Sequence, residues 1–242
     1  KKIYKAIKKS PLEDEAKYKY SGLAFYLFPE MVEELSDEDY VKYINDNFYI
    51  PLGATTLGFR PFEKFPLERI VPTENDYLFR SQPIHGPVHD EGAIMMGGVS
   101  AKAGVFANAN DLAKLIQMYL EGGEYGGKRY ISEETIQEFI RYQFPENDNR
   151  RGLGFDKPNL ERSPTGNAAV SSSDSSFGHS GFTGTFTWAD PEHNLVYVFL
   201  SNRVHPTRDN TRLYKLNTRT NIQQVIYDSL IDGITYSVGL EY

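Results

Sequence analysis

The segment that decides the fold runs from Phe177 to Arg203 and reads FGHSGFTGTFTWADPEHNLVYVFLSNR. Two runs rich in β-branched and aromatic residues, 183–188 and 195–200, enclose the polar turn sequence ADPEHN. Two such runs around a short polar loop predict an antiparallel hairpin. The second run is almost wholly apolar, which predicts a central strand covered on both faces.

The residues from Gly178 to Gly181 precede the first run and combine an imidazole, a hydroxyl and bare backbone. A glycine at a strand start often marks close approach by a ligand or another chain. One interpretation is a nucleophile elbow, Gly-x-Ser-x-Gly, with Ser180 attacking; Phe182 then stands where a small residue is needed, and strand rather than helix follows. Two further interpretations are possible. The segment could be the Lys-Thr-Gly strand of penicillin-recognising enzymes or an ordinary hairpin, and these residues alone do not decide between them.

Composition narrows the classes of protein. The chain has 242 residues, 40% hydrophobic and 24% charged, as in globular proteins, with a net charge of -7 and no basic block. Nucleic acid is therefore not an expected partner, and no apolar run is long enough for a membrane span. With no cysteine, a disulfide framework is excluded. The chain starts with Lys1 and shows no signal peptide, so we expect a processed or truncated piece.

Helix signals are spread along the chain. A helix over 22–35 should be capped by Ser21 and kinked or split by Pro29. Further helices are predicted over 37–48, over 110–121 with Asn108 or Asn110 as the cap, after Ser132, and over 209–230. The segment 60–98 has little periodicity and is expected to be a long irregular excursion, and the serine-rich segment 163–176 is expected to be mobile.

A histidine pair lies in the long excursion. His85 and His89, with Asp90, could serve as metal ligands, but a flexible proline-rich loop is a poor scaffold for a metal site. We therefore expect no metal there.

The order of these pieces carries a resemblance. Five features follow one another along the chain: Tyr20-Ser21, the glycines Gly97-Gly98 with Gly104, the helix over 110–121, the hairpin and a C-terminal helix. This order resembles the serine hydrolase family of class C β-lactamases, D-Ala-D-Ala carboxypeptidases and related esterases. It is most similar to the version fused behind a family-three glycosidase in gut bacteria. His179-Ser180-Gly181 is similar to the His-Ser-Gly or His-Thr-Gly variant of the family's Lys-Thr-Gly strand.

The resemblance implies the fold and the site. The fold would be α+β, a β-lactamase-like antiparallel sheet flanked by helices plus a helical region, forming a single partial domain over residues 1–242. The substrate would be an ester or a peptidoglycan-type amide, with no cofactor. The implied catalytic groups are Tyr20, His179 and the Phe182 N–H, and the implied substrate-binding residues are Ser21, Ser180 and Gly181.

Departures from the family pattern matter as well. No serine is followed by lysine three places on, so the family's Ser-x-x-Lys nucleophile is absent from this chain, and only 19 residues precede Tyr20. We therefore expect that the N-terminal part of the domain is missing. Gly22 replaces the family's Asn or Asp, and Lys102 stands where related sequences carry His.

These departures leave an alternative open. The chain could be a non-catalytic pseudo-hydrolase, or an accessory domain that binds cell-wall fragments or glycans. Expected partners are a small-molecule or peptidoglycan-type substrate and either the missing N-terminal part or a second copy of the chain. The expected location is periplasmic or extracellular.

Overall fold

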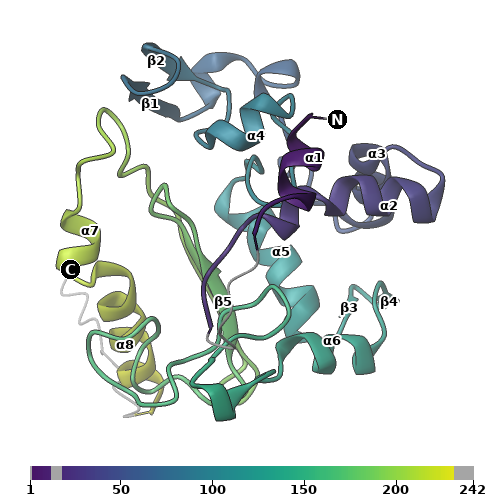
Figure 1. The fold of residues 1–242 in the computed structure, drawn as a ribbon. Helices are drawn as coiled ribbons and strands as arrows, with labels where there is room; N and C mark the ends of the chain where they lie inside the picture. Colours follow the sequence, from purple (N-terminus) through teal and green to yellow (C-terminus); the bar gives the residue numbers. More distant parts are fainter. Residues whose placement is uncertain (1, 12–17, 232–242) are drawn as a thin grey trace, which may run out of the picture.

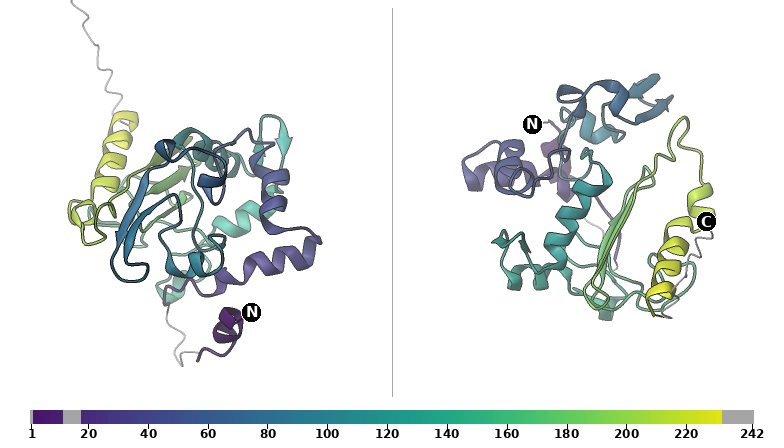
Figure 2. Two further views of the ribbon diagram at one scale, coloured as in Figure 1. Left: turned by 90° about the horizontal axis from the view of Figure 1, so that it is seen from above. Right: turned by 180° about the vertical axis from the view of Figure 1, so that it is seen from behind.

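A three-stranded antiparallel sheet lies at the centre of the computed structural model, which describes residues 2–11 and 18–231. Its strands are β5 (Phe177–Ser180), β6 (Phe186–Asp190) and β7 (Leu195–Phe199), in the order β5-β6-β7. Helix α5 (Ala109–Leu120) covers one face and helix α8 (Thr218–Ile231) covers the other (Figures 1 and 2). The predicted α+β class, an antiparallel sheet flanked by helices, is confirmed.

Alternation along β6 divides the core into two halves. Phe186 and Trp188 point to the α8 side, where their rings stack 5.4 Å apart and Ile226 packs against them. Ala189 points the other way and packs against Ile116 of α5. Successive side chains of a strand face opposite sides of the sheet, so a strand covered on both sides carries apolar residues at nearly every position. The wholly apolar sequence of β7, LVYVF, reflects these two helical layers, with Val196 on the α5 side and Tyr197 and Phe199 on the α8 side.

The hairpin differs in detail from the prediction. His179 and Ser180 end a strand of their own, β5, whereas the sequence suggested that they open the hairpin's first strand. A turn follows in which the Gly184 N–H donates to the Gly181 carbonyl at 3.0 Å. Strand β6 becomes the central strand and β7 an edge strand, because β5 pairs with β6 on its other side.

The helices after the excursion start where the sequence places them. The side chain of Asn108 accepts a hydrogen bond from the Asp111 N–H at 2.7 Å, and Ser132 caps α6 (Glu133–Ile140) through the Thr135 N–H at 3.2 Å. Such caps satisfy backbone donors that the first helical turn leaves unpaired. Between α5 and α6 lies a small hairpin of β3 (Glu124–Tyr125) and β4 (Lys128–Arg129).

The N-terminal helices are shorter than predicted. The first described helix is α1 (Lys2–Lys8). Pro29 splits the predicted helix over 22–35 into a 3-10 turn, η1 (Ala24–Tyr26), and helix α2 (Phe28–Ser36), because proline is tolerated only in a first turn. Helix α3 (Tyr40–Ile44), which runs on as the π-helical turn η2 (Asn45–Tyr49), is capped by Asp39 rather than by the predicted Ser36-Asp37.

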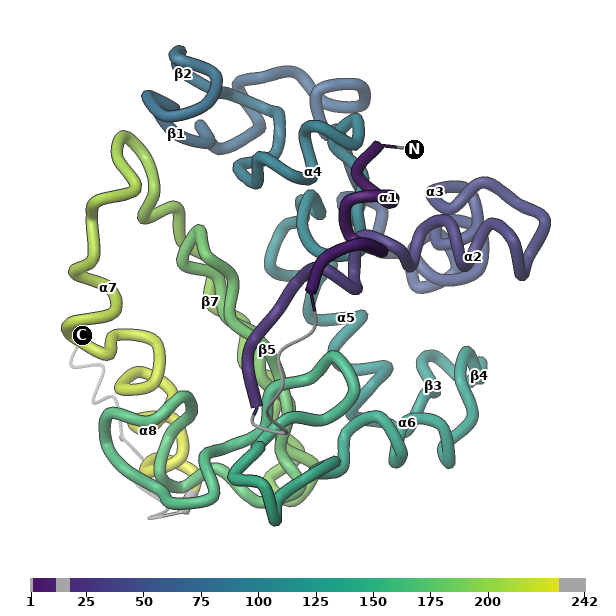
Figure 3. Tube along the Cα trace, in the orientation of Figure 1, coloured from purple at the N-terminus to yellow at the C-terminus, as the bar shows by residue number. Residues whose placement is uncertain are grey.

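The segment 60–98 is more ordered than predicted. It folds into two 3-10 turns, η3 (Pro61–Glu63) and η4 (Leu67–Arg69), the antiparallel pair β1 (Pro72–Asp76) and β2 (Gln82–His85), and helix α4 (Glu91–Met95). The tube in Figure 3 shows this segment, with β1, β2 and α4, at the top of the view, above the sheet. Its order comes from ion pairs between residues far apart in sequence, which periodicity cannot reveal.

The serine-rich segment and the C-terminal helix also differ from the predictions. Residues 163–176 hold no strand or helix, but Ser173 is buried and donates through its hydroxyl to the buried Asp190 at 2.6 Å. The segment is therefore anchored to the core, although mobility was expected from its composition. The C-terminal helix is divided into α7 (Arg212–Lys215) and α8 at Asn217, whose positive φ of 47° interrupts the helix. One further 3-10 turn is η5 (Pro145–Asn147), and none of the described helices has the length and apolarity of a membrane span.

The exposed edge of the sheet leads to a prediction. Strand β7 pairs only with β6 among the described residues, and its sequence, LVYVF, is wholly apolar. An unpaired apolar edge is a template for pairing with another chain. We expect the isolated chain to form dimers or larger species in sedimentation velocity at micromolar concentration. A single monomeric boundary would show that this edge is protected.

Candidate active site

A cleft of about 1400 Å³ opens at the end of β5. Five of the six residues implied by the resemblance line it, namely Tyr20, His179, Ser180, Gly181 and Phe182. The sixth, Ser21, is not in the lining; its hydroxyl instead accepts a hydrogen bond from the Leu23 N–H at 3.3 Å. Residues separated by most of the chain thus meet at one opening, although their roles remain predictions.

His179 is held by both of its ring nitrogens. Its Nδ1 lies 2.8 Å from the Ser180 carbonyl oxygen, and its Nε2 lies 3.0 Å from Nη1 of Arg151. Burial lowers the pKa of His179, and the charge of Arg151 acts in the same direction, against the hydrogen bond to Ser180. The imidazole therefore stays neutral where an exposed histidine would begin to protonate.

The turn after Gly181 presents a free backbone donor. The Phe182 N–H has no acceptor among the described residues, whereas the Phe182 carbonyl accepts from Arg203 Nε and from the Tyr214 hydroxyl, both at 2.9 Å. The Phe182 ring stacks on His89 with centroids 4.7 Å apart and planes 11° apart. Phe182 is thus held through its carbonyl and its ring, and its N–H can bind an oxyanion without rearrangement.

Lys102 covers the position where the family pattern has a side chain. A Cβ built on Gly22 would lie 2.7 Å from the Lys102 Cε. The Lys102 ammonium is held by Asp90 at 2.8 Å and by the Tyr26 hydroxyl at 3.2 Å. The two departures noted in the sequence, at positions 22 and 102, therefore fit each other, because a larger residue at 22 would displace this lysine.

Asp90 organises that cluster. Burial opposes ionisation, but hydrogen bonds from Lys102, Tyr26 and the Ala93 N–H keep the pKa of Asp90 below its usual value. The carboxylate is therefore charged at neutral pH, and it both caps α4 and fixes the lysine at the cleft wall.

The two histidines considered as metal ligands have protein partners. His85 Nε2 lies 2.6 Å from the Ile70 carbonyl oxygen and His89 Nδ1 lies 2.7 Å from the Glu74 carboxylate. In the described part of the chain, no three His, Asp or Glu side chains are grouped as metal ligands would be.

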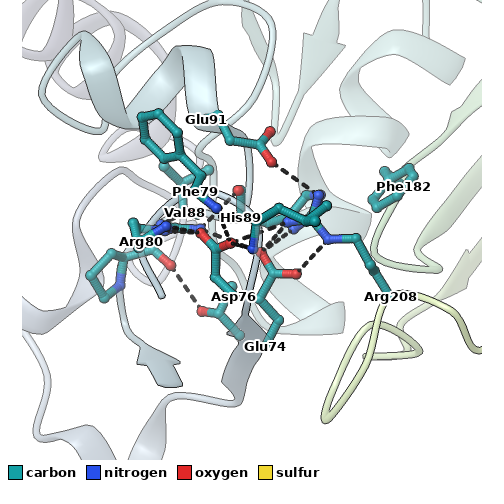
Figure 4. A network of polar contacts seen from close by, with 12 residues as sticks. Glu74, Asp76, Phe79, Arg80, Val88, His89, Glu91, Phe182 and Arg208 are labelled. Carbon is teal, nitrogen blue, oxygen red and sulfur yellow. Dashed lines mark hydrogen bonds and ion pairs between the residues drawn. The ribbon is translucent and has the colours of Figure 1, made fainter. Parts of the chain in front are cut away.

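Figure 4 shows a network of buried ion pairs, three members of which, His89, Glu91 and Arg208, line the cleft. Glu74, which is fully buried, accepts from Arg208 at 3.0 Å, from Arg80 at 3.3 Å and bonds His89 at 2.7 Å. Arg208 also pairs with Glu91 at 2.9 Å. Because Arg208 belongs to the segment after β7, this network ties the excursion to the C-terminal part of the chain and places His89 under Phe182.

Removal of one partner should weaken this network. We expect Arg208→Ala to lower the free energy of unfolding by about 3 kcal/mol, because it removes a cation from a buried carboxylate. The matched control is Arg212→Ala, a change four residues on to an arginine with no ion pair in the described part of the chain. Urea unfolding followed by circular dichroism measures both. Equal stabilities of the two variants would show that Glu74 does not depend on Arg208.

Several residues of this site were not predicted from the sequence. Arg151 and the pair Glu74–Arg208 join segments far apart in the chain and form no motif. The sequence had drawn attention to Asp90 only beside the histidines and to Lys102 only as a departure from the family pattern, and their pairing was not predicted. The proximity of a buried carboxylate to two guanidinium groups is visible only in the structure. The sequence of β1, PTEND, gives no alternation that would mark Glu74 and Asp76 as buried.

Comparison with known proteins identifies the family. A family model described as Beta-lactamase matches residues 1–221. The chain belongs to the β-lactamase family. A protein of Escherichia coli O157:H7 named "Putative D-alanyl-D-alanine carboxypeptidase" is 36% identical over 213 residues, and one of the same name from Salmonella enteritidis PT4 is also 36% identical over 213 residues. The matches cover 82% of this chain but 48% and 49% of those proteins, so the chain spans about half the length of the curated relatives it matches.

Solved structures of the β-lactamase type agree with the fold. A β-lactamase from Mycobacterium bovis aligns with a TM-score of 0.59 at 20% identity, covering 88% of this chain and 65% of that one. Simvastatin synthase from Aspergillus terreus aligns with a TM-score of 0.64 at 16% identity, covering 98% and 62%. These likenesses support the β-lactamase-like fold. Nothing in them bears on the predicted fusion to a glycosidase.

Proposed function

We propose that this chain forms the C-terminal part of the catalytic domain of a serine hydrolase that works through an acyl-enzyme. The observation that carries the proposal is the meeting of Tyr20, His179 and the Phe182 N–H at one cleft. Local sequence preferences give a capping-region tyrosine and a strand histidine no reason to meet. A shared catalytic task does give one.

The proposed roles follow from the chemistry of each group. The nucleophilic serine would come from residues outside this chain, and Tyr20 would accept its proton and later return it to the leaving group. The free Phe182 N–H would bind the oxyanion of the tetrahedral intermediate, a contribution worth about 3 kcal/mol of barrier in comparable sites. Ser180 and Gly181 would contact the substrate, with Gly181 leaving room for its backbone. No step of such acyl transfer needs a cofactor.

The substrate class is an ester or a peptidoglycan-type amide. The named relatives point to peptides ending in D-Ala-D-Ala, which occur in the bacterial cell wall. A periplasmic or extracellular location would follow from that substrate. The partner needed for activity would be the rest of the domain, in the same polypeptide or in another copy.

Two sequence features favour a second candidate function. No Ser-x-x-Lys occurs in the 242 residues, and Gly22 lacks the side chain that the family pattern has there. A pseudo-hydrolase or accessory domain that binds cell-wall fragments or glycans would tolerate both changes. Binding without turnover is its signature.

The isolated chain provides the first test. We expect it to hydrolyse neither a chromogenic cephalosporin nor p-nitrophenyl esters, because it has no activated serine. Stopped-flow absorbance would detect a burst of acylation. A burst that Ser180→Ala abolishes would overturn the assignment and support the nucleophile elbow instead.

The second test uses a longer polypeptide that contains this chain together with a Ser-x-x-Lys segment. Tyr20→Phe should lower kcat/KM by about 10²–10⁴-fold on p-nitrophenyl esters and on a peptide ending in D-Ala-D-Ala, because the proton acceptor is lost. Tyr18→Phe, two residues away at an exposed tyrosine, is the control and should keep the parent rate. Specific binding of muropeptides with no turnover by the parent would instead favour the accessory role.

A further inference from the structure

Arg151 lies between the two candidate catalytic side chains. Its Nη1 is 3.0 Å from Nε2 of His179, and its guanidinium carbon is 5.1 Å from the centre of the Tyr20 ring. The side chain is 17% exposed and is not part of the cleft lining. Arg151 thus contacts both residues from behind the cleft wall.

The contact with Arg151 decides which nitrogen of His179 carries the proton. A guanidinium group can only donate hydrogen bonds, so Nε2 of His179 must be the acceptor and must carry no hydrogen. The Ser180 carbonyl oxygen, 2.8 Å from Nδ1, can only accept, so Nδ1 carries the hydrogen. The two partners therefore permit one state of the ring, the neutral Nδ1–H tautomer.

The position of Arg151 is itself fixed by a buried carboxylate. Asp156 is 5% exposed and lies 3.4 Å from Arg151 Nε and 2.8 Å from Arg150 Nε. Asp156 is anchored to β5 by a reciprocal pair of backbone hydrogen bonds with Gly178, at 2.7 and 2.9 Å. Asp156, which pairs with Arg151, is therefore hydrogen-bonded to Gly178, the residue before His179 on β5.

Charged groups around His179 have opposing effects. Burial lowers the pKa of His179 and the charges of Arg151 and Arg150 act in the same direction, whereas the Asp156 carboxylate and the Ser180 carbonyl raise it. Arg150 differs from Arg151 in one respect that matters here. It pairs with the same Asp156, at 2.8 Å, but has no contact with the histidine or with Tyr20 in the described part of the chain.

We propose that Arg151 is a positioning residue that locks His179 in the Nδ1–H tautomer and holds the Tyr20 ring at the cleft. This role rests on the proposed function, because it gives His179 and Tyr20 their working orientations. A cation over an aromatic face restrains the ring through its attraction to the π-electrons, and the hydrogen bond to Nε2 restrains the imidazole. With Nε2 occupied, His179 serves as an oriented neutral group and the proton transfer falls to Tyr20.

Nuclear magnetic resonance on the 242-residue chain tests the tautomer directly. Ring nitrogen shifts of His179, assigned by their loss in His179→Gln, should show a protonated Nδ1 and an unprotonated Nε2, retained below the pH at which an exposed histidine protonates. In Arg151→Met the titration should move to higher pH and the tautomers should mix. Arg150→Met removes a similar charge and its pairing with Asp156 but no contact with His179 or Tyr20, so the Nδ1–H tautomer should persist.

Arg151→Lys is the conservative variant and the safeguard if Arg151→Met does not fold. A single ammonium cannot both reach Nε2 and lie over the Tyr20 ring, so we expect an intermediate titration and partial mixing of tautomers. Unchanged His179 shifts in both Arg151 variants, or in the lysine variant alone if the other is unfolded, would overturn the proposal. Effects of Arg150→Met as large as those of Arg151→Met would do the same, since charge alone would then explain them.

Kinetics in the longer polypeptide separates this inference from the proposed function. There, Arg151→Met should lower kcat by about 10-fold or more with little change in KM, because orientation of reacting groups is lost while binding surface remains. Arg150→Met should keep kcat within about twofold of the parent. If the parent hydrolyses nothing while the shifts of His179 change as expected, the proposed function fails and the positioning of His179 by Arg151 stands. If the parent is active while the shifts stay unchanged, the proposed function stands and the positioning role of Arg151 fails.

Discussion

The buried carboxylate of Asp156 is the interaction on which the candidate site depends. Asp156 lies in the segment before β5 and forms paired backbone hydrogen bonds with Gly178, and its carboxylate forms ion pairs with the guanidinium groups of Arg150 and Arg151. A buried carboxylate needs such compensation, because an unpaired charge out of water is costly. One of the two cations, Arg151, also forms a hydrogen bond with His179. Asp156 thus both pairs with β5 through its backbone and, through Arg151, helps to orient His179.

The opposite wall of the cleft is organised by charge as well. Glu74 is fully buried in the excursion, and the arginine that pairs with it, Arg208, comes from the far end of the sequence. Between these walls, Phe182 stacks on His89 and its carbonyl is bound by Arg203. The backbone donor proposed for the oxyanion is therefore held from several sides. Pre-orientation of this kind matters because a donor that must move loses part of its benefit in the transition state.

The free edge of the sheet and the length of the relatives bear on the same proposal, that further residues complete the domain. The chain spans about half the length of the relatives it matches, and its last strand, β7, has an apolar free edge in the part of the chain that the structure describes. The cleft has a wall bearing Tyr20 and a wall bearing His179, whereas the proposed nucleophile lies elsewhere. Under the proposal, a nucleophilic serine supplied by the same polypeptide or by another copy would make the chain part of a hydrolase, and without such a serine it would be a binding module.

The sequence by itself determined the features that depend on neighbours in the chain. The apolar runs predicted the paired strands, and Asn108 and Ser132 predicted helix starts, because strand alternation and helix capping involve residues within a few positions. The order of short motifs indicated the family and brought Tyr20, His179 and Phe182 into one hypothesis.

Tertiary structure decided what connects distant segments. It showed that β5 is a separate strand, that residues 60–98 are ordered around Glu74, and that Lys102 fills the space beside Gly22. It also placed Arg151 between Tyr20 and His179. Ion pairs, stacking and shared space depend on three-dimensional proximity, and no periodicity in the sequence encodes which distant charge will meet which ring.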